Sequence, residues 1–281
     1  MDPMLAEAMQ VAVEAAHAAG QVLCDMLETA SVREKAPKDL VTDADVAAQN
    51  EIQQRIAAVF PTHSFLGEES SDQPVTPATA HVEPWRWVVD PLDGTVNFVH
   101  RLPNFAVSIA LMNRDTTVLG VVFDPMAKEM YAATLGGGAT INGKPLRSSL
   151  CTKLNAALVA ASFPPNIQRG SVEVEQFIEI LIQSQSVRRL GSAALNLCYV
   201  GHGRLDGYWA SCLKVWDIAA GALIAAEAGA VLSKQNGDIF DPWLGELIAT
   251  STQELHGELR DCLDSVRVHF SNQAGILRKT T

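Results

Sequence analysis

Apolar residues recur at every third or fourth position in several segments of the chain, which is the spacing of an amphipathic helix. The first such segment has its apolar positions at Leu5, Met9, Val13, Ala16, Gly20, Leu23 and Leu27. A polar stretch, residues 33–39, separates it from a second predicted helix, which starts near Thr42 and ends at Pro61. The apolar face of that second helix comprises Ala48, Ile52, Ile56 and Val59.

Three further helices are predicted in the second half of the chain. Residues 174–182 form an amphipathic helix whose apolar positions are Val174, Phe177, Ile178, Leu181 and Ile182. Residues 193–200 predict a shorter helix. Residues 218–228 are apolar on almost every side, so we expect them to form a buried helix.

Short apolar runs between the helices predict strands at 85–89, 105–112, 117–123, 130–134 and 205–210. Turns are predicted at 113–115, at Asn142-Gly143 and at the glycine run 136–138, which lacks the Lys-Ser/Thr ending of a phosphate-binding loop. Residues 70–84 are rich in Pro, Ser and Thr and predict a surface loop.

Because helices and strands interleave, the chain belongs to the α/β or α+β class, with layered helices and sheets. We find no repeat and no linker, and therefore expect a single domain over residues 1–281 with a loose end from about residue 271.

Composition narrows the possible functions. The chain has 281 residues, of which 48% are hydrophobic, so it can bury a large core. Its formal net charge of −11 argues against binding to nucleic acid and against adhesion to an anionic membrane. The first ten residues lack the basic start of a signal peptide, and no apolar run reaches the length of a membrane helix.

The cysteines indicate the compartment. Five of them are widely and irregularly spaced, without a Cys-x-x-Cys pair, so neither structural zinc nor a disulfide framework is expected. A reducing, cytoplasmic location fits this pattern best.

Two acidic residues lie directly after the predicted strand 85–89, in Asp90-Pro-Leu-Asp-Gly-Thr95. Taken alone, Asp90 and Asp93 fit a turn or a helix cap as well as a catalytic site. If residues 95–99 start a helix, their free N–H groups could face an anion.

Other acids lie at similar boundaries, and each has a local explanation. Asp45 follows Thr42 by three residues, as in a capping box. Asp217 begins the apolar helix, where the helix dipole favours an acid, and Glu68 fits a solvated loop.

If the fold brings these acids together, their like charges repel and raise one another's pKa. Hard divalent cations such as Mg²⁺ relieve that repulsion through carboxylate and carbonyl oxygens. Two such ions, roughly 3.5–4 Å apart, can activate a water and stabilise a leaving oxygen. A phosphate ester, whose own negative charge needs offsetting, is the substrate that such a site suits.

Four motifs in this order resemble the inositol monophosphatase family of Mg²⁺-dependent, Li⁺-sensitive phosphatases, over about residues 5–255. They are Asp39-Leu-Val-Thr-Asp-Ala-Asp45, Gly67-Glu-Glu-Ser70, Asp90-Pro-Leu-Asp-Gly-Thr-Val-Asn-Phe-Val-His100 and Trp216-Asp-Ile-Ala-Ala-Gly221. The resemblance implies a layered αβαβα fold, a homodimer, two or three Mg²⁺ ions, and hydrolysis of a small phosphate ester without a covalent enzyme intermediate.

The resemblance also implies roles for individual residues. Glu68, Asp90 and the carbonyl of Leu92 resemble the ligands of the first Mg²⁺. Asp90, Asp93 and Asp217 resemble the ligands of the second.

Asp45 corresponds to the acid that polarises Thr95, whose hydroxyl helps to activate the attacking water, and that can reach a third ion. Substrate contacts are implied for Asp93, Gly94, Thr95, Gly191, Ser192, Ala193 and Asp217.

Two positions depart from the family pattern. Ala210 stands where many members that act on inositol phosphates have a Glu that binds substrate hydroxyls, and Glu34, beside Lys35, stands where a Lys often lies.

The leading expected substrate is inositol-1-phosphate. Histidinol phosphate, fructose 1,6-bisphosphate and adenosine 3′,5′-bisphosphate remain alternatives. So does a regulatory protein of the same fold that acts through a protein partner, since some bacterial relatives have roles at ribosomal-RNA transcription.

Overall fold

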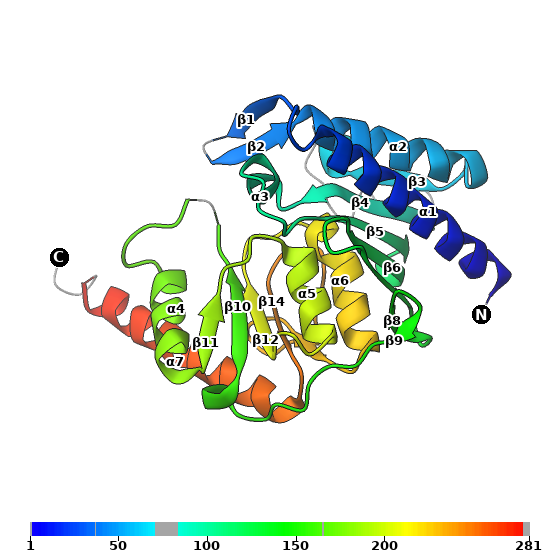
Figure 1. Ribbon diagram of the computed structural model, residues 1–281. Helices are drawn as coiled ribbons and strands as arrows, with labels where there is room; N and C mark the ends of the chain where they lie inside the picture. The colour runs from blue at the N-terminus through cyan, green and yellow to red at the C-terminus, as the bar shows by residue number, and fades with distance from the viewer. Residues whose placement is uncertain (1, 37, 71–83, 165, 278–281) are drawn as a thin grey trace.

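The computed structural model describes residues 2–36, 38–70, 84–164 and 166–277, and shows five layers in the order αβαβα (Figure 1). Helices α1 (Pro3–Met26) and α2 (Asp43–Val59) cover one face of a seven-stranded sheet. Helices α5 (Ala193–Gly201) and α6 (Val215–Glu227) lie between that sheet and a five-stranded one. Helices α4 (Val172–Gln183) and α7 (Gln253–Leu277) cover the far side. The layered fold predicted from the sequence is thus confirmed.

The seven-stranded sheet is mostly antiparallel, and its strands follow the chain order. They are β3 (Ser64–Gly67), β4 (Trp85–Asp93), β5 (Ala106–Asn113), β6 (Thr116–Asp124), β7 (Glu129–Thr134), β8 (Gly138–Ile141) and β9 (Lys144–Pro145). Only β3 and β4 run parallel, so their carboxyl ends lie side by side.

The five-stranded sheet has its strands in a different order from the chain. In spatial order they are β11 (Ser186–Arg188), β10 (Leu158–Ser162), β12 (Gly207–Ala210), β14 (Leu247–Thr250) and β13 (Val231–Ser233). Two short elements complete the site region: a hairpin of β1 (Val32–Ala36) and β2 (Asp39–Thr42), and the short helix α3 (Thr95–Val99).

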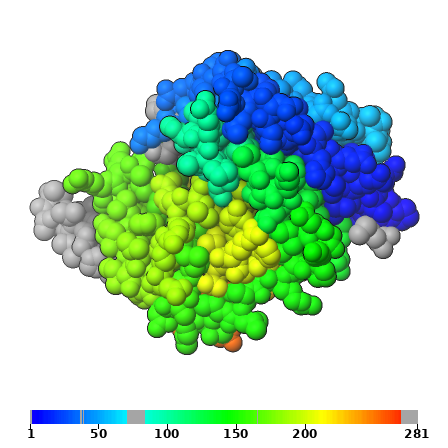
Figure 2. Space-filling view, viewed as in Figure 1, coloured from blue at the N-terminus to red at the C-terminus, as the bar shows by residue number. Residues whose placement is uncertain are grey.

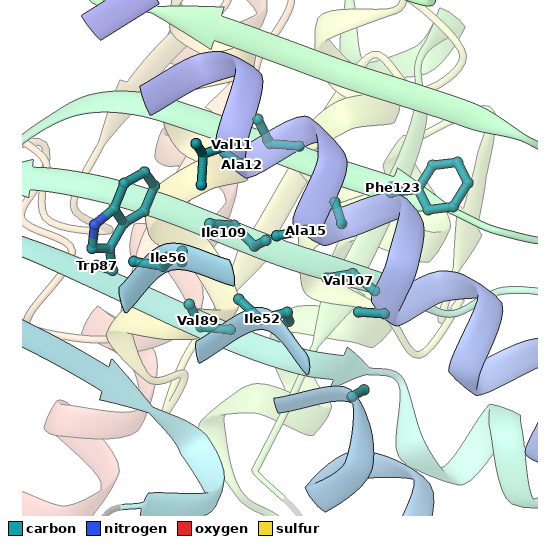
Figure 3. Close-up of a cluster of buried hydrophobic side chains, with 14 of the residues drawn as sticks. Val11, Ala12, Ala15, Ile52, Ile56, Trp87, Val89, Val107, Ile109 and Phe123 are labelled. Carbon is teal, nitrogen blue, oxygen red and sulfur yellow. The ribbon is translucent and has the colours of Figure 1, made fainter. Parts of the chain in front are cut away.

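The central strands of the large sheet are buried on both faces, and their alternate residues therefore join different cores. Trp87 and Val89 of β4 pack with Ile52 and Ile56 of α2 in the cluster that Figure 3 shows. Val88, between them in sequence, faces the α5–α6 layer instead. A group of charged side chains is therefore expected at the ends of these strands rather than in their middle.

Most predicted elements are found within a few residues of their expected bounds, and three differ in a physical way. The polar stretch 33–39 forms the β1–β2 hairpin, whose β1 residues are exposed on both faces, so no alternation of apolar residues marks it. Val59 is 42% exposed rather than buried on α2, since it lies at the last turn of that helix.

The third difference concerns α4, which buries Gln176 and Ile180. The predicted apolar face is wrong for Ile178, Leu181 and Ile182, which are 43%, 50% and 72% exposed, whereas Phe177 packs against a core cluster as predicted.

Outside these elements, the predicted loop 70–84 falls almost wholly outside the described residues. Helix α7 continues to Leu277, past the point where a loose end is expected. Within the described ranges, no helix has both the length and the hydropathy that crossing a membrane requires.

The glycine run 136–138 is a turn, as predicted. The carboxylate of Glu227 accepts hydrogen bonds from the N–H groups of Gly136 (2.7 Å) and Gly138 (2.8 Å). These N–H groups are therefore already paired with an anion from the protein itself.

Two glycines test how tightly the layers pack. A Cβ at Gly120 of β6 would lie 2.7 Å from the carbonyl oxygen of Ala220 in α6, whereas a Cβ at Gly257 of α7 meets nothing within 4 Å. We expect Gly120→Ala to lower the free energy of unfolding by about 1–3 kcal/mol through overpacking. Gly257→Ala, the matched control, should raise it by about 0.5–1 kcal/mol. Urea unfolding measures both, and equal effects of the two substitutions would contradict this packing.

Candidate active site

The candidate site begins at the carboxyl end of β4. Between Asp90, which faces Ser108 of β5, and Asp93, which faces Ala106, the pairing register shifts by one residue. In a regular strand, residues three apart point to opposite faces, but one extra residue in a bulge returns the second to the side of the first. The bulge thus gives Asp90 and Asp93 a common site, in which they are 2% and 7% exposed.

Two other elements bring acids to the same place. Because β3 is parallel to β4 and pairs Gly67 with Val89, Glu68 emerges beside Asp90, close enough for its charge to raise the pKa of Asp90. Asp217 lies in the first turn of α6, where its Oδ2 accepts a bond from the N–H of Lys214 at 2.8 Å.

Helix α6 is fixed there by a bond from Ser108 Oγ, opposite Asp90, to the carbonyl of Trp216 at 3.1 Å. The first turn of α6 is therefore tied directly to the strand that faces Asp90.

The electrostatics show that these acids share one environment. Burial raises the pKa of Asp90 well above its usual range, and the charges of Glu68 and Asp93 add to this rise. Asp217 acts on Asp90 in the same direction. Burial, then the charges of Asp93 and Glu68, likewise raise the pKa of Asp217.

Asp45 lies next to Thr95 at the rim of this group. The Thr95 hydroxyl oxygen is 3.3 Å from Asp45 Oδ1 and 3.1 Å from the carbonyl oxygen of Leu92. The other carboxylate oxygen of Asp45 accepts bonds from the N–H and hydroxyl of Thr42, which completes the predicted capping box. Burial outweighs these bonds and raises the pKa of Asp45 to about 6. Asp45 therefore both caps α2 and contacts Thr95.

Asp93 also has a structural role. Its carboxylate accepts bonds from the Ser192 hydroxyl and from the N–H groups of Ala193 (3.1 Å) and Ala194 (2.7 Å), at the first turn of α5. Burial nevertheless raises the pKa of Asp93 to about 6. These bonds bring the exposed Gly191 next to the carboxylate group, so the segment with predicted substrate contacts borders the site.

The hairpin resolves the question of Glu34 and Lys35. Lys35 Nζ lies 3.2 Å from Glu68 Oε1 and 2.6 Å from Glu69 Oε1, whereas Glu34 accepts a bond from the N–H of Lys38 within the hairpin. Lys35, rather than the residue at position 34, thus brings a positive charge to the acids.

Sequence reasoning missed two kinds of residue at the site. Gln49, one helical turn after Asp45, accepts a bond from the Glu69 N–H at 2.9 Å and donates one to Ser70 Oγ at 2.8 Å. The four-residue spacing from Asp45 was the available signal. Asn97 and its neighbour Asn104 bridge distant segments, for which no local pattern exists.

The donors present fit a hard divalent cation, because they are carboxylate and carbonyl oxygens without His or Cys. Among the residues that the structure describes, no three His, Cys, Asp or Glu side chains are grouped closely enough to hold an ion as they stand. Glu68 contacts Lys35, Asp93 contacts the start of α5, and Asp217 contacts the Lys214 N–H. These contacts offset part of the negative charge of the acids, and a carboxylate that accepts such a bond keeps lone pairs that a cation can use.

The fold and this oxygen-rich site define a layered α/β protein with a candidate metal centre at the end of a strand. Residues 4–266 match the inositol monophosphatase family, and the chain belongs to this family.

Similar proteins include Nus factor SuhB of Salmonella typhimurium strain LT2, 37% identical over 270 residues that cover 95% of this chain and 98% of that protein. Nus factor SuhB of Pseudomonas aeruginosa is 37% identical over 259 residues, covering 90% and 93%.

Two solved structures are also similar in fold. The inositol monophosphatase from Anabaena (Nostoc) sp. PCC 7120 has a TM-score of 0.81 and 33% identity, and covers 93% of this chain and 96% of that one. SuhB from Bartonella henselae has a TM-score of 0.83 and 33% identity, with coverage of 92% and 98%.

The raised pKa values predict a metal-linked dependence of stability on pH. Groups whose pKa rises on folding stabilise the protein at low pH and lose that contribution as pH rises through the folded value, which for Asp45 and Asp93 is about 6. We expect the melting temperature in EDTA to fall between about pH 4 and pH 7, and Mg²⁺ to restore it more at the higher pH.

Asp90→Asn removes one of the repelling charges and should raise the melting temperature in EDTA while abolishing most of the Mg²⁺ effect. Thermal unfolding with and without Mg²⁺ measures this. An equal Mg²⁺ effect in the variant would contradict the assignment.

Proposed function

We propose that this protein is a Mg²⁺-dependent phosphomonoesterase that hydrolyses a small polyol or sugar-like phosphate, with inositol-1-phosphate as the leading candidate. One observation carries the proposal: four acids from three separate elements act on one another at the end of β4, beside a threonine hydroxyl paired with a fifth acid. Family membership supports the same class of reaction.

In this proposal Glu68, Asp90 and the Leu92 carbonyl hold a first Mg²⁺. Asp90, Asp93 and Asp217 hold a second. A third ion can reach Asp45. When bound, the ions supply positive charge that offsets the charge of the phosphate ester and make water more acidic.

The residues of the chain contribute orientation and proton transfer. The Thr95 hydroxyl lies between two acceptors, Asp45 and the Leu92 carbonyl, and is held where a water beside the phosphate could pass its proton on. A threonine hydroxyl is a poor base alone, so the Asp45 carboxylate serves as the acceptor behind it. Gly94, at a φ of +96°, turns the chain so that the N–H groups of Gly94 and Thr95 can bind phosphate oxygens.

The leaving group would contact Gly191, Ser192 and Ala193. Ala210 is fully buried in the same core cluster as Ala193, and its carbonyl accepts a bond from Gln235 Nε2 at 2.7 Å. This position therefore offers no carboxylate to the hydroxyl groups of a substrate. For this reason, phosphate esters other than inositol-1-phosphate remain candidate substrates.

We further propose that the protein works in the cytoplasm as a homodimer, which the family resemblance and the free, scattered cysteines support.

A second candidate function comes from the names of the relatives. Several proteins 36–37% identical to this chain over nearly their whole length are named Nus factor SuhB. The protein could accordingly act as a regulatory factor through a protein partner. Mg²⁺-stimulated hydrolysis of any phosphate ester favours the first function. A stable complex with a transcription factor and no hydrolysis would favour the second.

Asp90→Asn should lower kcat by about a thousandfold or more, because it removes a charge shared by both proposed ion sites. Asp124→Asn is the matched control. Asp124 is 1% exposed, and one oxygen of its carboxylate accepts both bonds, from the N–H groups of Met126 and Ala127, so asparagine can replace it.

Phosphate release is measured in Mg²⁺ with inositol-1-phosphate, histidinol phosphate, fructose 1,6-bisphosphate and adenosine 3′,5′-bisphosphate. Full activity of Asp90→Asn on the preferred ester, with metal content controlled, would refute the proposal.

Li⁺ should inhibit the hydrolysis, because a small monovalent cation can take the place of Mg²⁺ at Asp93 and Asp217 and slow the release of phosphate. Steady-state rates are measured over a Li⁺ series, with Na⁺ or K⁺ at equal ionic strength as the control. Rates that Li⁺ and K⁺ affect equally would count against the second ion site.

A further inference from the structure

The side chain of Asn97 joins two segments that are far apart in the chain. Its Nδ2 donates one hydrogen bond to the carbonyl of Asn104 and another to the carbonyl of Leu190, each at 2.7 Å. The residue is only 9% exposed, so water cannot easily replace these bonds. Asn97 therefore ties α3, which begins at Thr95, to the residue that precedes Gly191.

A second amide strengthens this connection. Asn104 Nδ2 donates to the same Leu190 carbonyl at 3.0 Å, and Asn104 Oδ1 accepts a bond from the Tyr199 hydroxyl at 3.3 Å. Both lone pairs of the Leu190 carbonyl are thus used by amides that follow the Asp-Gly-Thr turn. In the space-filling view, the teal surface of the α3 segment lies between the blue surface of the N-terminal part and the yellow-green surface of the second half (Figure 2).

Two glycines allow the segments to approach this closely. A Cβ at Gly191 would lie 2.7 Å from Asn97 Nδ2, and a Cβ at Gly94 would lie 3.3 Å from the Gly191 carbonyl oxygen. Both glycines have positive φ, +87° and +96°, which other residues rarely adopt. The turn at Gly94 and the turn at Gly191 are therefore in direct contact.

The segment 190–194 is consequently held at two points. Asp93 binds its C-terminal part, through Ser192, Ala193 and Ala194, and Asn97 binds its N-terminal part, through Leu190. The exposed Gly191 lies between the two attachments.

We propose that Asn97 is a positioning residue that sets the place of segment 190–194 relative to the turn 93–95, and thereby decides how well the enzyme discriminates between leaving groups. This inference rests on the proposed phosphatase function, in which residues 93–95 hold the phosphate side of the ester and 191–193 the leaving-group side. Asn97 contacts neither the substrate nor an ion in this scheme, and it acts through Leu190.

The geometry explains why an asparagine is needed. One nitrogen with two hydrogens serves two carbonyl acceptors, whereas the hydroxyl of serine can donate only one bond. A glutamine amide would be displaced by one methylene, toward a Gly191 backbone that leaves no room. An aspartate keeps the size but places an anionic oxygen against two carbonyl oxygens, so it should push Leu190 away.

The test compares Asn97→Asp with the matched control Asn142→Asp. Asn142 also uses its side chain to hold a turn, accepting from the Met130 N–H at 2.8 Å and donating to the Lys128 carbonyl at 3.1 Å, in the hairpin between β8 and β9. The substrates are the most active ester of the four-compound panel and p-nitrophenyl phosphate, whose leaving group has no polyol hydroxyls.

We expect Asn97→Asp to lower kcat/KM for the polyol or sugar ester by about a hundredfold, the cost of a displacement of about 1 Å. For p-nitrophenyl phosphate the loss should be less than about tenfold, since only the leaving-group side moves. The Mg²⁺ concentration for half-maximal stabilisation against heat should stay within about threefold of that of the unmodified protein, because no proposed ligand is changed. Asn142→Asp should change none of these quantities.

Hydrogen exchange of peptides that cover residues 190–196 provides a readout independent of catalysis. Asn97→Asp should speed it by about tenfold or more, and Asn142→Asp should not. Unchanged exchange in Asn97→Asp would overturn the attachment itself. Faster exchange with equal losses on both esters, or with no loss, would overturn the role in discrimination.

If Asn97→Asp does not fold, Asn104→Asp carries the same test with a smaller effect, because it removes only the 3.0 Å bond and keeps the acceptor for Tyr199. If the unmodified protein hydrolyses no ester, the proposed function fails and the role in discrimination fails with it. Hydrogen exchange then still decides whether Asn97 holds the segment.

Discussion

The repulsion between buried carboxylates at the end of β4 is the constraint on which the site depends. Asp90 is 2% exposed, and three other acids raise its pKa beyond the effect of burial alone. A group of this kind is costly unless protons, protein donors or cations balance it. The protein supplies part of that balance through Lys35 and through N–H groups at the first turns of α5 and α6. The ammonium group of Lys35 and the N–H groups at the starts of α5 and α6 thus hold the acids in place.

Local structure and chemistry use the same side chains. Asp45 completes the capping box of α2 and also contacts Thr95. Asp93 lies at the end of the β4 bulge and accepts a hydrogen bond from the first turn of α5. The same acid can therefore cap a helix and also serve as a ligand or proton acceptor at the site. A cap fixes the rotamer of a carboxylate by hydrogen bonding one or both of its oxygens, which is what an ordered ligand or acceptor also needs.

The sequence predicts a helix best where the spacing of apolar residues and the capping residues indicate the same bounds. Helices α1, α2 and α6 are of this kind, and their bounds lie near those expected. It ends the strand at Val89, because Asp-Pro-Leu-Asp is typical of a turn, whereas a bulge keeps Asp93 paired with Ala106. It also places Ile178, Leu181 and Ile182 of α4 in the core, whereas the helix packs against α7 through Gln176 and Ile180. The individual acids are visible in the sequence, but their meeting depends on the parallel register of β3 and β4 and on the Ser108–Trp216 bond. Such long-range contacts have no local pattern, and only the resemblance suggested them. For the same reason, neither the reach of Lys35 nor the bridge of Asn97 could be foreseen.

Two kinds of hydrogen bond hold the site: those of the carboxylates and those of the Asn97 and Asn104 amides. The carboxylates are charged and exchangeable, so their hydrogen bonds change with pH and with any cation that enters. The bonds of Asn97 and Asn104 to the Leu190 carbonyl are neutral, buried and free of titrating groups. They depend instead on a close approach that the glycines at 94 and 191 permit. The amide bridge therefore fixes the relative position of the two turns through bonds that do not depend on the protonation of the acids.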